Sequence, residues 1–289
     1  MEIGVVLPNG APAVDGPTLL DWATRIENRG FESVGVIGRI AYPTHEEMVT
    51  LAAVAGATTR VRLLTSTVVA PLRDPILLAK QAASIDRLSG GRLVLGLSAG
   101  MRADDFVVTG TNFSDRGRRF DRMLETMHAL WRGEPPGEGS REACPPPVAG
   151  RIPIYFGALT PSPKIVRRIA RWGDGFIAVG SPVMVAPMVD AIHAAWNARG
   201  REGKIRLVGA SYFALGHHAV ASEAERNVID YYSDFFPQLG NAAAAAMIRT
   251  PEAARRTLQI FEDAGFDEFN FSAAAADPDQ VDRLADAVL

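Results

Sequence analysis

The sequence of 289 residues contains a single cysteine, Cys144, so no internal disulfide can form. So little cysteine is typical of a reducing compartment, and we expect a cytoplasmic protein. The stretch from Met1 to Leu20 lacks a basic start followed by an apolar core, and no apolar run reaches membrane-spanning length. We therefore expect neither a signal peptide nor a membrane segment.

The sequence also lacks an excess of either charge, and it lacks several common catalytic motifs. Its net charge is −3, whereas a nucleic-acid surface needs a basic stripe, so we expect no nucleic-acid partner. There is no phosphate loop, and no set of Ser, His and Asp residues forms a recognisable catalytic triad pattern. The adjacent histidines His217 and His218 have no carboxylate or cysteine at ligand spacing, so we expect no metal site.

What the sequence does contain is a repeated alternation of short apolar strands and helical patterns. A helix is predicted to begin at Asp74–Pro75, because aspartate accepts a hydrogen bond from a first-turn amide and proline there has no amide to satisfy. Gly90–Gly91 is predicted to end that helix. The predicted strands are Ile3–Leu7, Ser33–Ile37, Val61–Ser66, Leu93–Leu97, Ile154–Phe156, Gly175–Val179, Leu207–Ala214 and Glu268–Ser272.

This alternation predicts the fold class. Eight βα units, in a chain near the roughly 250 residues typical of such a fold, predict an α/β protein with a closed (β/α)8 TIM barrel. We expect residues 1–289 to form one domain. A doubly wound open sheet is the main alternative, but strand and helix alternate to the end and no Gly-x-Gly-x-x-Gly opens the chain.

One long ordered pattern resembles a known family. The run LTSTVVAPLRDPILLAKQAASIDRLSGGRLVLGLSAGMRADDF is continued by FSDRGRRFDRMLETMHALW, and IGVVLP, GFESVGV and RWGDGFIAVG lie elsewhere in the chain. Together they resemble the bacterial-luciferase-like monooxygenases. The resemblance implies a barrel that binds a flavin, or its deazaflavin analogue, at the carboxyl ends of the strands. It does not supply a substrate.

The resemblance implies where the ring of the cofactor lies. It places a non-prolyl cis peptide bond at Ser66–Thr67, as a bulge behind the ring, and a close approach of the backbone to the pyrimidine edge at Gly100 and Met101. Glycine permits such an approach because it has no Cβ. The alternatives are an ordinary trans strand end at Ser66–Thr67 and a simple turn at Gly100.

The phosphate end of the cofactor is expected after the fifth and sixth predicted strands, because helix amino ends with free amides bind anions. Simple capping by Ser162 and Ser181 is the alternative. Luciferase subunits have an arginine after the Asp-Phe pair, where this chain has Val107, so one phosphate contact is missing or is supplied by Arg102, Arg116 or Arg118. The residues predicted at the phosphate end are Gly157, Ala158, Thr160, Gly180 and Ser181.

The end of the second strand departs from the family pattern. Many relatives have an acidic residue followed by histidine or arginine there, whereas this chain has Gly38 and Arg39. Arg39 is expected to stabilise an anionic reduced flavin or an acidic substrate. Tyr42 and His45 are the other catalytic candidates, with His45 as a proton donor near neutral pH. The alternative for His45 is packing or capping at the start of the helix Glu46–Ala57.

Three functions remain open at this point. The first is a monooxygenase that uses reduced FMN and oxygen on a small organic substrate, with a separate flavin reductase as a partner. The second is a dehydrogenase or reductase that uses coenzyme F420, a deazaflavin. The third is a degenerate barrel that binds a flavin or another ligand without catalysis.

We also expect a homodimer. One helical stripe serves either the core of the barrel or a dimer contact: Phe120, Met123, Leu124, Met127 and Trp131.

Overall fold

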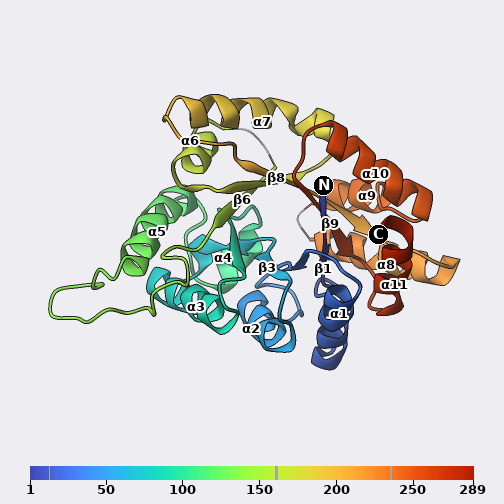
Figure 1. The fold of residues 1–289 in the computed structure, drawn as a ribbon, viewed down its shortest axis with the longest axis horizontal. Coiled ribbons are helices and arrows are strands. Elements are labelled where there is room, and N and C mark those ends of the chain that lie inside the picture. Colours follow the sequence, from blue (N-terminus) through green and yellow to red (C-terminus); the bar gives the residue numbers. More distant parts are fainter. Residues whose placement is uncertain (13, 160–161, 235) are drawn as a thin grey trace.

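One closed parallel sheet organises the chain (Figure 1). The computed structural model describes residues 1–12, 14–159, 162–234 and 236–289. The sheet order is β3-β2-β1-β9-β8-β7-β6-β5-β4, and a pairing between β3 and β5 closes the ring. The predicted (β/α)8 barrel is therefore confirmed, and the open-sheet alternative is wrong. The strands are β1 (Glu2–Val6), β2 (Ser33–Val36), β3 (Arg62–Thr65), β4 (Val68–Val69), β5 (Leu93–Ser98), β6 (Ile154–Ala158), β7 (Gly175–Val179), β8 (Arg206–Phe213) and β9 (Glu268–Ala273).

The strands β3 and β4 share one position in the ring. β3 pairs with the start of β5, and β4 pairs with its end through Val68 opposite Leu97. The two strands are separated by a cis peptide bond between Ser66 and Thr67, as the family resemblance implied, and the trans alternative is wrong. The wall of the barrel therefore has eight strand positions, as the sequence predicted.

Helices alternate with the strands and begin where the sequence predicts them. Asp74 accepts hydrogen bonds from the amides of Ile76 and Leu77, both at 2.9 Å, and α3 starts at the proline that follows. Gly90 and Gly91 follow the end of α3 with φ of 69° and 89°. The helices are α1 (Gly16–Asn28), α2 (Glu47–Ala57), the 3-10 turn η1 (Ala70–Leu72), α3 (Pro75–Leu88), α4 (Ala103–Val108), α5 (Arg116–Trp131), α6 (Pro163–Trp172), α7 (Pro182–Asn197), α8 (His218–Tyr232), α9 (Pro237–Ala245), α10 (Pro251–Asp263) and α11 (Asp279–Val288).

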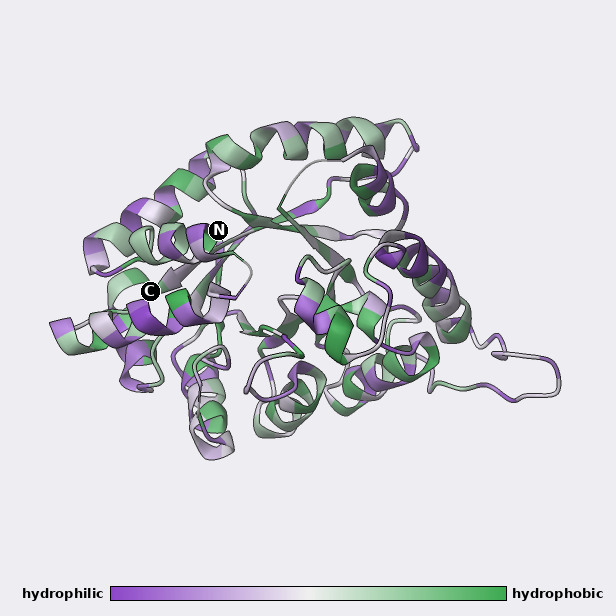
Figure 2. Ribbon diagram, turned by 180° about the vertical axis from the view of Figure 1, so that it is seen from behind, coloured by the Kyte–Doolittle hydropathy of each residue, from purple (hydrophilic) through white to green (hydrophobic). Residues whose placement is uncertain are grey.

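The outer helices carry hydrophilic and hydrophobic residues around their circumference, as helices that cover a core do (Figure 2). The stripe from Phe120 to Trp131 on α5 is buried in the main core, so its five residues pack between α5 and the rest of the chain, and the dimer alternative for this stripe is wrong. A separate apolar cluster is made by Leu64, Val94, Tyr155, Ile177 and Val208, which lie on five strands. Among the residues that the structure describes, no helix combines the length and the apolar character needed to cross a membrane.

A glycine in β5 sets how closely β3 and β5 approach each other. A Cβ on Gly96 would lie 1.8 Å from the carbonyl oxygen of Thr65, and the Thr65 hydroxyl donates to the Gly96 carbonyl at 2.8 Å. Only a residue without a side chain fits there. This approach holds the end of β3 next to β5, directly before the break at Ser66–Thr67.

We predict that Gly96→Ala lowers the free energy of unfolding by about 1–3 kcal/mol, the range for overpacking a filled site. Gly56→Ala is the matched control, because a Cβ at this position in α2 meets nothing within 4 Å. An alanine in a helix is favoured over glycine by roughly 0.5–1 kcal/mol, so the control should be no less stable than the wild type. Chemical denaturation measures both, and equal stabilities of the two variants would contradict the close approach.

Candidate functional site

The carboxyl end of the barrel is accessible along one side. Strands β3, β5, β6 and β7 are largely buried along their length, but the residues at their exits are half-buried or exposed. We call these residues the open strip. Its members are Ser66, Thr67, Ser98, Ala99, Gly100, Met101, Gly157, Ala158, Leu159, Val179, Gly180 and Ser181.

The opposite side of the same end is covered. The residues that follow β1, β8 and β9 are buried, among them Leu7, Ala214 and Ala274. A second apolar cluster joins the exits of β8 and β9 to α8 and α9, with Val228 and Ala244 among its members. A ligand that enters from the carboxyl end therefore meets the open strip.

Two buried arginines hold the end of α8 in place. Arg39, after β2, donates from Nη1 to the carbonyl oxygen of Tyr231 at 2.8 Å, and Arg102, after β5, donates to the same oxygen at 3.0 Å. The Tyr212 hydroxyl of β8 lies 3.3 Å from the Tyr232 hydroxyl. The end of α8 thus contacts groups at β2, β5 and β8, which are spread around the ring. It must lie across part of the barrel mouth.

Carboxylates surround Arg39. Nη2 of Arg39 lies 2.7 Å from an oxygen of Asp104 and 3.1 Å from one of Asp234. Burial would lower the pKa of Arg39, but the hydrogen bonds to these two carboxylates outweigh it and the pKa is raised. The side chain is 0% exposed. Arg39 therefore pairs with the protein's own carboxylates, whereas the sequence had suggested an anionic reduced flavin or an acidic substrate as its partner.

The same network fixes Tyr42 and α4. The Tyr42 hydroxyl donates to Asp230 at 2.6 Å, and its ring lies 4.8 Å from the Arg39 guanidinium. Burial and the Asp230 carboxylate raise the pKa of Tyr42 above its ordinary value. Asp105 accepts from the amides of Ile40 and Ala41 at 3.0 and 2.7 Å. Figure 1 shows α4, which carries Asp105, inside the ring of outer helices.

A carboxyl group does lie next to Gly38, although the residue itself has none. A Cβ on Gly38 would lie 2.4 Å from the carboxyl carbon of Glu47, the first residue of α2. Glu47 is 3% exposed and accepts from Arg73 at 2.7 Å. Burial raises the pKa of Glu47, although Arg73 opposes the shift. The space that a side chain at Gly38 would need is therefore filled by Glu47.

At the predicted phosphate end, Ser162 and Ser181 differ. Ser162 accepts from the Ile165 amide at 3.2 Å and caps α6, as the capping alternative states. Ser181 precedes α7 but makes no capping hydrogen bond, so the first-turn amides of Val183 and Met184 have no side-chain partner among the described residues. Thr160, also predicted for this end, lies outside the described residues.

Of the arginines proposed to replace the missing phosphate contact, two are engaged elsewhere. Arg102 binds the Tyr231 carbonyl, and Arg116 donates to the carbonyl oxygens of Gly100 and Phe113 at 3.0 and 2.9 Å. Arg118 is exposed at the start of α5, without a hydrogen bond or ion pair to any described residue. Arg118 is therefore the one of the three that stays free for a phosphate.

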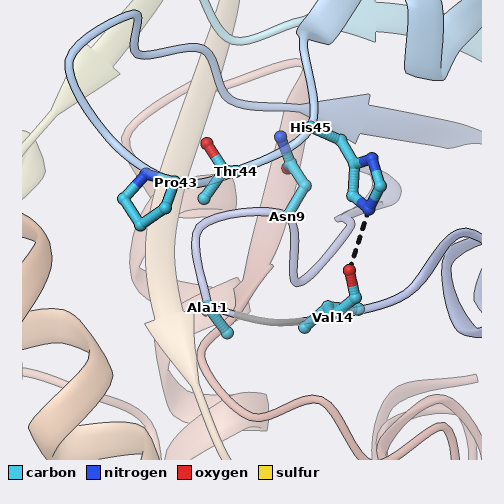
Figure 3. A pocket seen from close by; sticks show the side chains of 6 residues that line it. All are labelled: Asn9, Ala11, Val14, Pro43, Thr44 and His45. Atoms are coloured by element: carbon cyan, nitrogen blue, oxygen red, sulfur yellow. Dashed lines mark hydrogen bonds between the residues drawn. The ribbon is translucent and has the colours of Figure 1, made fainter.

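Of the remaining predicted residues, Gly100 and Met101 belong to the open strip, and His45 lies outside it. Gly100 has φ of 77°, and a Cβ there would lie 2.5 Å from a methyl carbon of Val69, so this position requires glycine for packing as well as for its turn. Met101 beside it is 39% exposed. His45 lies apart from the open strip. Its Nε2 is 2.9 Å from the Val14 carbonyl oxygen (Figure 3), and the amino end of α2 is capped by Glu46 and not by His45.

A closed parallel barrel that is accessible at the carboxyl ends of its strands defines the class of barrel proteins that bind small ligands at this face. The family described as luciferase-like monooxygenase matches residues 1–288. The chain belongs to this family, and the resemblance found in the sequence is confirmed. Among the described residues, no group of three or more His, Cys, Asp or Glu side chains is placed to hold a metal ion.

Two relatives in sequence and one solved structure are similar to this chain. An uncharacterized protein of Mycobacterium tuberculosis is 35% identical over 172 residues, which are 57% of this chain and 61% of that protein. The oxygenase component of a flavin-dependent trigonelline monooxygenase of Acinetobacter baylyi is 27% identical, over 76% of this chain and 72% of that one. The solved structure of an F420-dependent secondary alcohol dehydrogenase superposes with a TM-score of 0.81 at 17% identity, covering 99% of this chain and 98% of that one. The last likeness shows the fold alone.

The sequence pointed to Arg39 but missed its partners. Asp104 lies 65 residues away along the chain, and the Tyr231 carbonyl lies 192 residues away. Asp104 and Asp105 are in the run that carried the family resemblance, but nothing there indicated ion pairing. Glu47 gave a signal that was overlooked, since it is a second acidic residue directly before a mainly apolar helical run.

We predict that Arg102→Met loosens the end of α8, because it removes a charged hydrogen bond from a buried carbonyl. Hydrogen bonds to charged groups contribute about 1.5–3 kcal/mol, and Arg39 still binds the same oxygen, so we expect a loss of about 1–3 kcal/mol in unfolding free energy. Amides at the end of α8 should also exchange faster with solvent. Arg171→Met is the control, because Arg171 stacks on Trp172 and pairs with Glu125 while half exposed. Identical behaviour of the two variants would refute this role of Arg102.

Proposed function

We propose that this chain is a flavin-dependent monooxygenase that uses reduced FMN and oxygen to oxygenate a small organic substrate, with residues 1–289 acting as one domain. The observation that carries the proposal is the open strip, which follows four consecutive strand positions and ends at the uncapped amino end of α7. A flat ring with a phosphate tail suits such a strip. Membership of the luciferase-like monooxygenase family supports the same activity.

The residues of the strip fit the cofactor. Ser66 and Thr67 would lie behind the ring, with Gly100 and Met101 at its edge. Gly157 is needed beside them, because a Cβ there would lie 2.8 Å from a side-chain carbon of Thr67. Small residues and hydroxyl groups leave room for a ring and offer hydrogen bonds to it.

The phosphate tail would reach the start of α7. Gly180 and Ser181, with the free amides of the first turn, form an anion site of the kind that helix amino ends provide. Gly157 and Ala158 at the exit of β6 lie beside it, since β6 pairs with β7. Thr160 remains a proposed contact from the sequence, and Arg118 supplies positive charge in place of the arginine absent at Val107.

When bound, reduced FMN supplies the electrons that activate oxygen, while the protein positions the reactants and excludes water. Arg39 acts by position, since its guanidinium holds Asp104, Asp234 and the end of α8 over part of the mouth. Tyr42 joins this arrangement through Asp230. His45 stays the candidate for proton transfer.

The proposal includes partners. The relative from Acinetobacter baylyi is named as an oxygenase component, which supports a separate flavin reductase that delivers the reduced cofactor to this chain. We also propose a homodimer, whose contact uses a surface other than the buried stripe of α5.

A second candidate is an F420-dependent dehydrogenase. The fold admits it, because the F420-dependent secondary alcohol dehydrogenase has the same fold, with a TM-score of 0.81. The ring of either cofactor is flat and tricyclic, so the small residues of the open strip would leave room for both rings, and a binding measurement has to separate the two candidates.

We predict that FMN raises the melting temperature of the purified protein and F420 does not. A ligand at one hundred times its Kd stabilises the native state by about 2.7 kcal/mol, which a thermal scan detects. Ser181→Ala should weaken FMN binding three- to tenfold, the equivalent of one hydrogen bond. Ser84→Ala is the control, since this exposed hydroxyl on α3 bonds only the Lys80 carbonyl.

Each outcome decides between the candidates. A shift with F420 alone assigns the dehydrogenase. No response to either cofactor, oxidised or reduced, overturns both and favours the non-catalytic barrel. An equal loss of FMN affinity in Ser181→Ala and Ser84→Ala would contradict the phosphate end proposed here.

A further inference from the structure

Arg102 is a buried cation at the edge of the open strip. It directly follows Met101, a member of the strip, and its Nη1 donates to the Tyr231 carbonyl oxygen at the end of α8, at 3.0 Å. Only 8% of the residue is exposed. The guanidinium therefore lies where the open strip meets the part of the barrel mouth that α8 covers.

The charge of Arg102 has no carboxylate partner in the described part of the chain. Arg39 and Arg168 are the other buried arginines there, and each forms an ion pair at 2.7 Å, Arg39 with Asp104 and Arg168 with Asp121. The few residues outside the described ranges include no aspartate or glutamate. Burying a charge is costly unless it is paired, so an unpaired arginine at this place calls for a partner from outside the chain.

The surroundings of Arg102 hold its guanidinium without neutralising it. The central carbon of the guanidinium lies 4.7 Å from the centre of the Tyr231 ring and 4.9 Å from that of the Tyr232 ring. The face of an aromatic ring attracts a cation but carries no net charge. Two ring faces and one carbonyl oxygen therefore keep the side chain in place and leave its positive charge for another group.

The carboxylates of the same region have partners of their own. Asp104 and Asp234 pair with Arg39. Asp105 accepts from two backbone amides, and Asp230 accepts from a tyrosine hydroxyl. These contacts hold the four carboxylates in an arrangement that forms no ion pair with the second arginine.

The free edge of the Arg102 guanidinium has the geometry of a carboxylate site. Nη1 binds the Tyr231 carbonyl oxygen, whereas Nε and Nη2 make no hydrogen bond to a described residue. Neither of these two nitrogens is fully enclosed, unlike the unpaired Nε of Arg39. Nε and Nη2 donate side by side from one edge of the planar group, and this edge matches the two oxygens of a carboxylate. An acid can therefore bind Arg102 through two parallel hydrogen bonds.

We propose that Arg102 binds the carboxylate of a small organic acid where the open strip meets α8, and that this acid is the substrate. That the acid is a substrate rests on the proposed function, whereas its carboxylate is inferred from Arg102 alone. The phosphate proposed for the cofactor lies at the start of α7, so Arg102 is left for a second anion. The sequence suggested Arg39 as the cation for an acidic substrate, and the structure moves this role to Arg102.

The test uses benzoate as the probe, with benzamide as its uncharged counterpart of similar shape. The whole chain is labelled with 15N-arginine and titrated without any flavin, while NMR follows the Nε–H signal of Arg102, assigned from its absence in Arg102→Lys. We expect benzoate to move this signal and to bind about tenfold more tightly than benzamide, because hydrogen bonds between two charged groups are stronger than those to a neutral amide.

Arg102→Lys keeps the positive charge but has no planar edge, so most of the preference for benzoate over benzamide should be lost. Arg168→Lys is the matched control, because this buried arginine also donates to a carbonyl oxygen, that of Gly117, but already has a carboxylate partner. It should leave the preference unchanged. Equal binding of benzoate and benzamide, shifts confined to Arg118, or an unchanged preference in Arg102→Lys would each overturn the carboxylate site.

A second titration, in the presence of FMN, separates the substrate from the cofactor. Benzoate that still moves the Arg102 signal supports an acid bound beside the cofactor. Displacement of benzoate by FMN would assign Arg102 to an anion of the cofactor and overturn the substrate role. If FMN does not bind, the proposed function fails, but the titration without flavin still decides whether Arg102 binds a carboxylate.

Discussion

The carbonyl oxygen of Tyr231 accepts hydrogen bonds from two buried arginines, and the shape of the barrel mouth depends on this contact. The carboxyl end of a helix carries unpaired carbonyls and partial negative charge, so cations are favourable there. Because Arg39 follows β2 and Arg102 follows β5, the contact holds the end of α8 over one side of the mouth. The open strip is what this arrangement leaves accessible.

The fold could be predicted from the sequence because its signals are local. A strand such as Gly175–Val179 and a helix start such as Asp74–Pro75 are set by neighbouring residues, and the structure has both. The placement of the cis bond at Ser66–Thr67 came from the family resemblance. The partners of Arg39 could not be predicted, because tertiary packing brings them from 65 and more residues away.

The structure changes the chemistry that the sequence suggested. Arg39 was expected to meet an anion, but the protein's own carboxylates neutralise it. Gly38 lacked an acid, but the Glu47 carboxyl group fills the space beside it. What remains for ligands along the open strip is a set of small residues and hydroxyl groups, with Arg118 as an exposed cation at the start of α5. Electron transfer therefore falls to a bound cofactor, and recognition of that cofactor falls to shape, to hydroxyl and amide hydrogen bonds, and to Arg118.

The central claim is that a flavin occupies the open strip. Amide hydrogen exchange with and without FMN tests it most directly, because protection can be mapped along the chain. We predict slower exchange at residues 66–69, 98–101, 157–159, 181, 183 and 184, and little change at the amino-terminal end of the barrel. No protection by FMN, or protection confined to the amino-terminal end of the barrel, would contradict it.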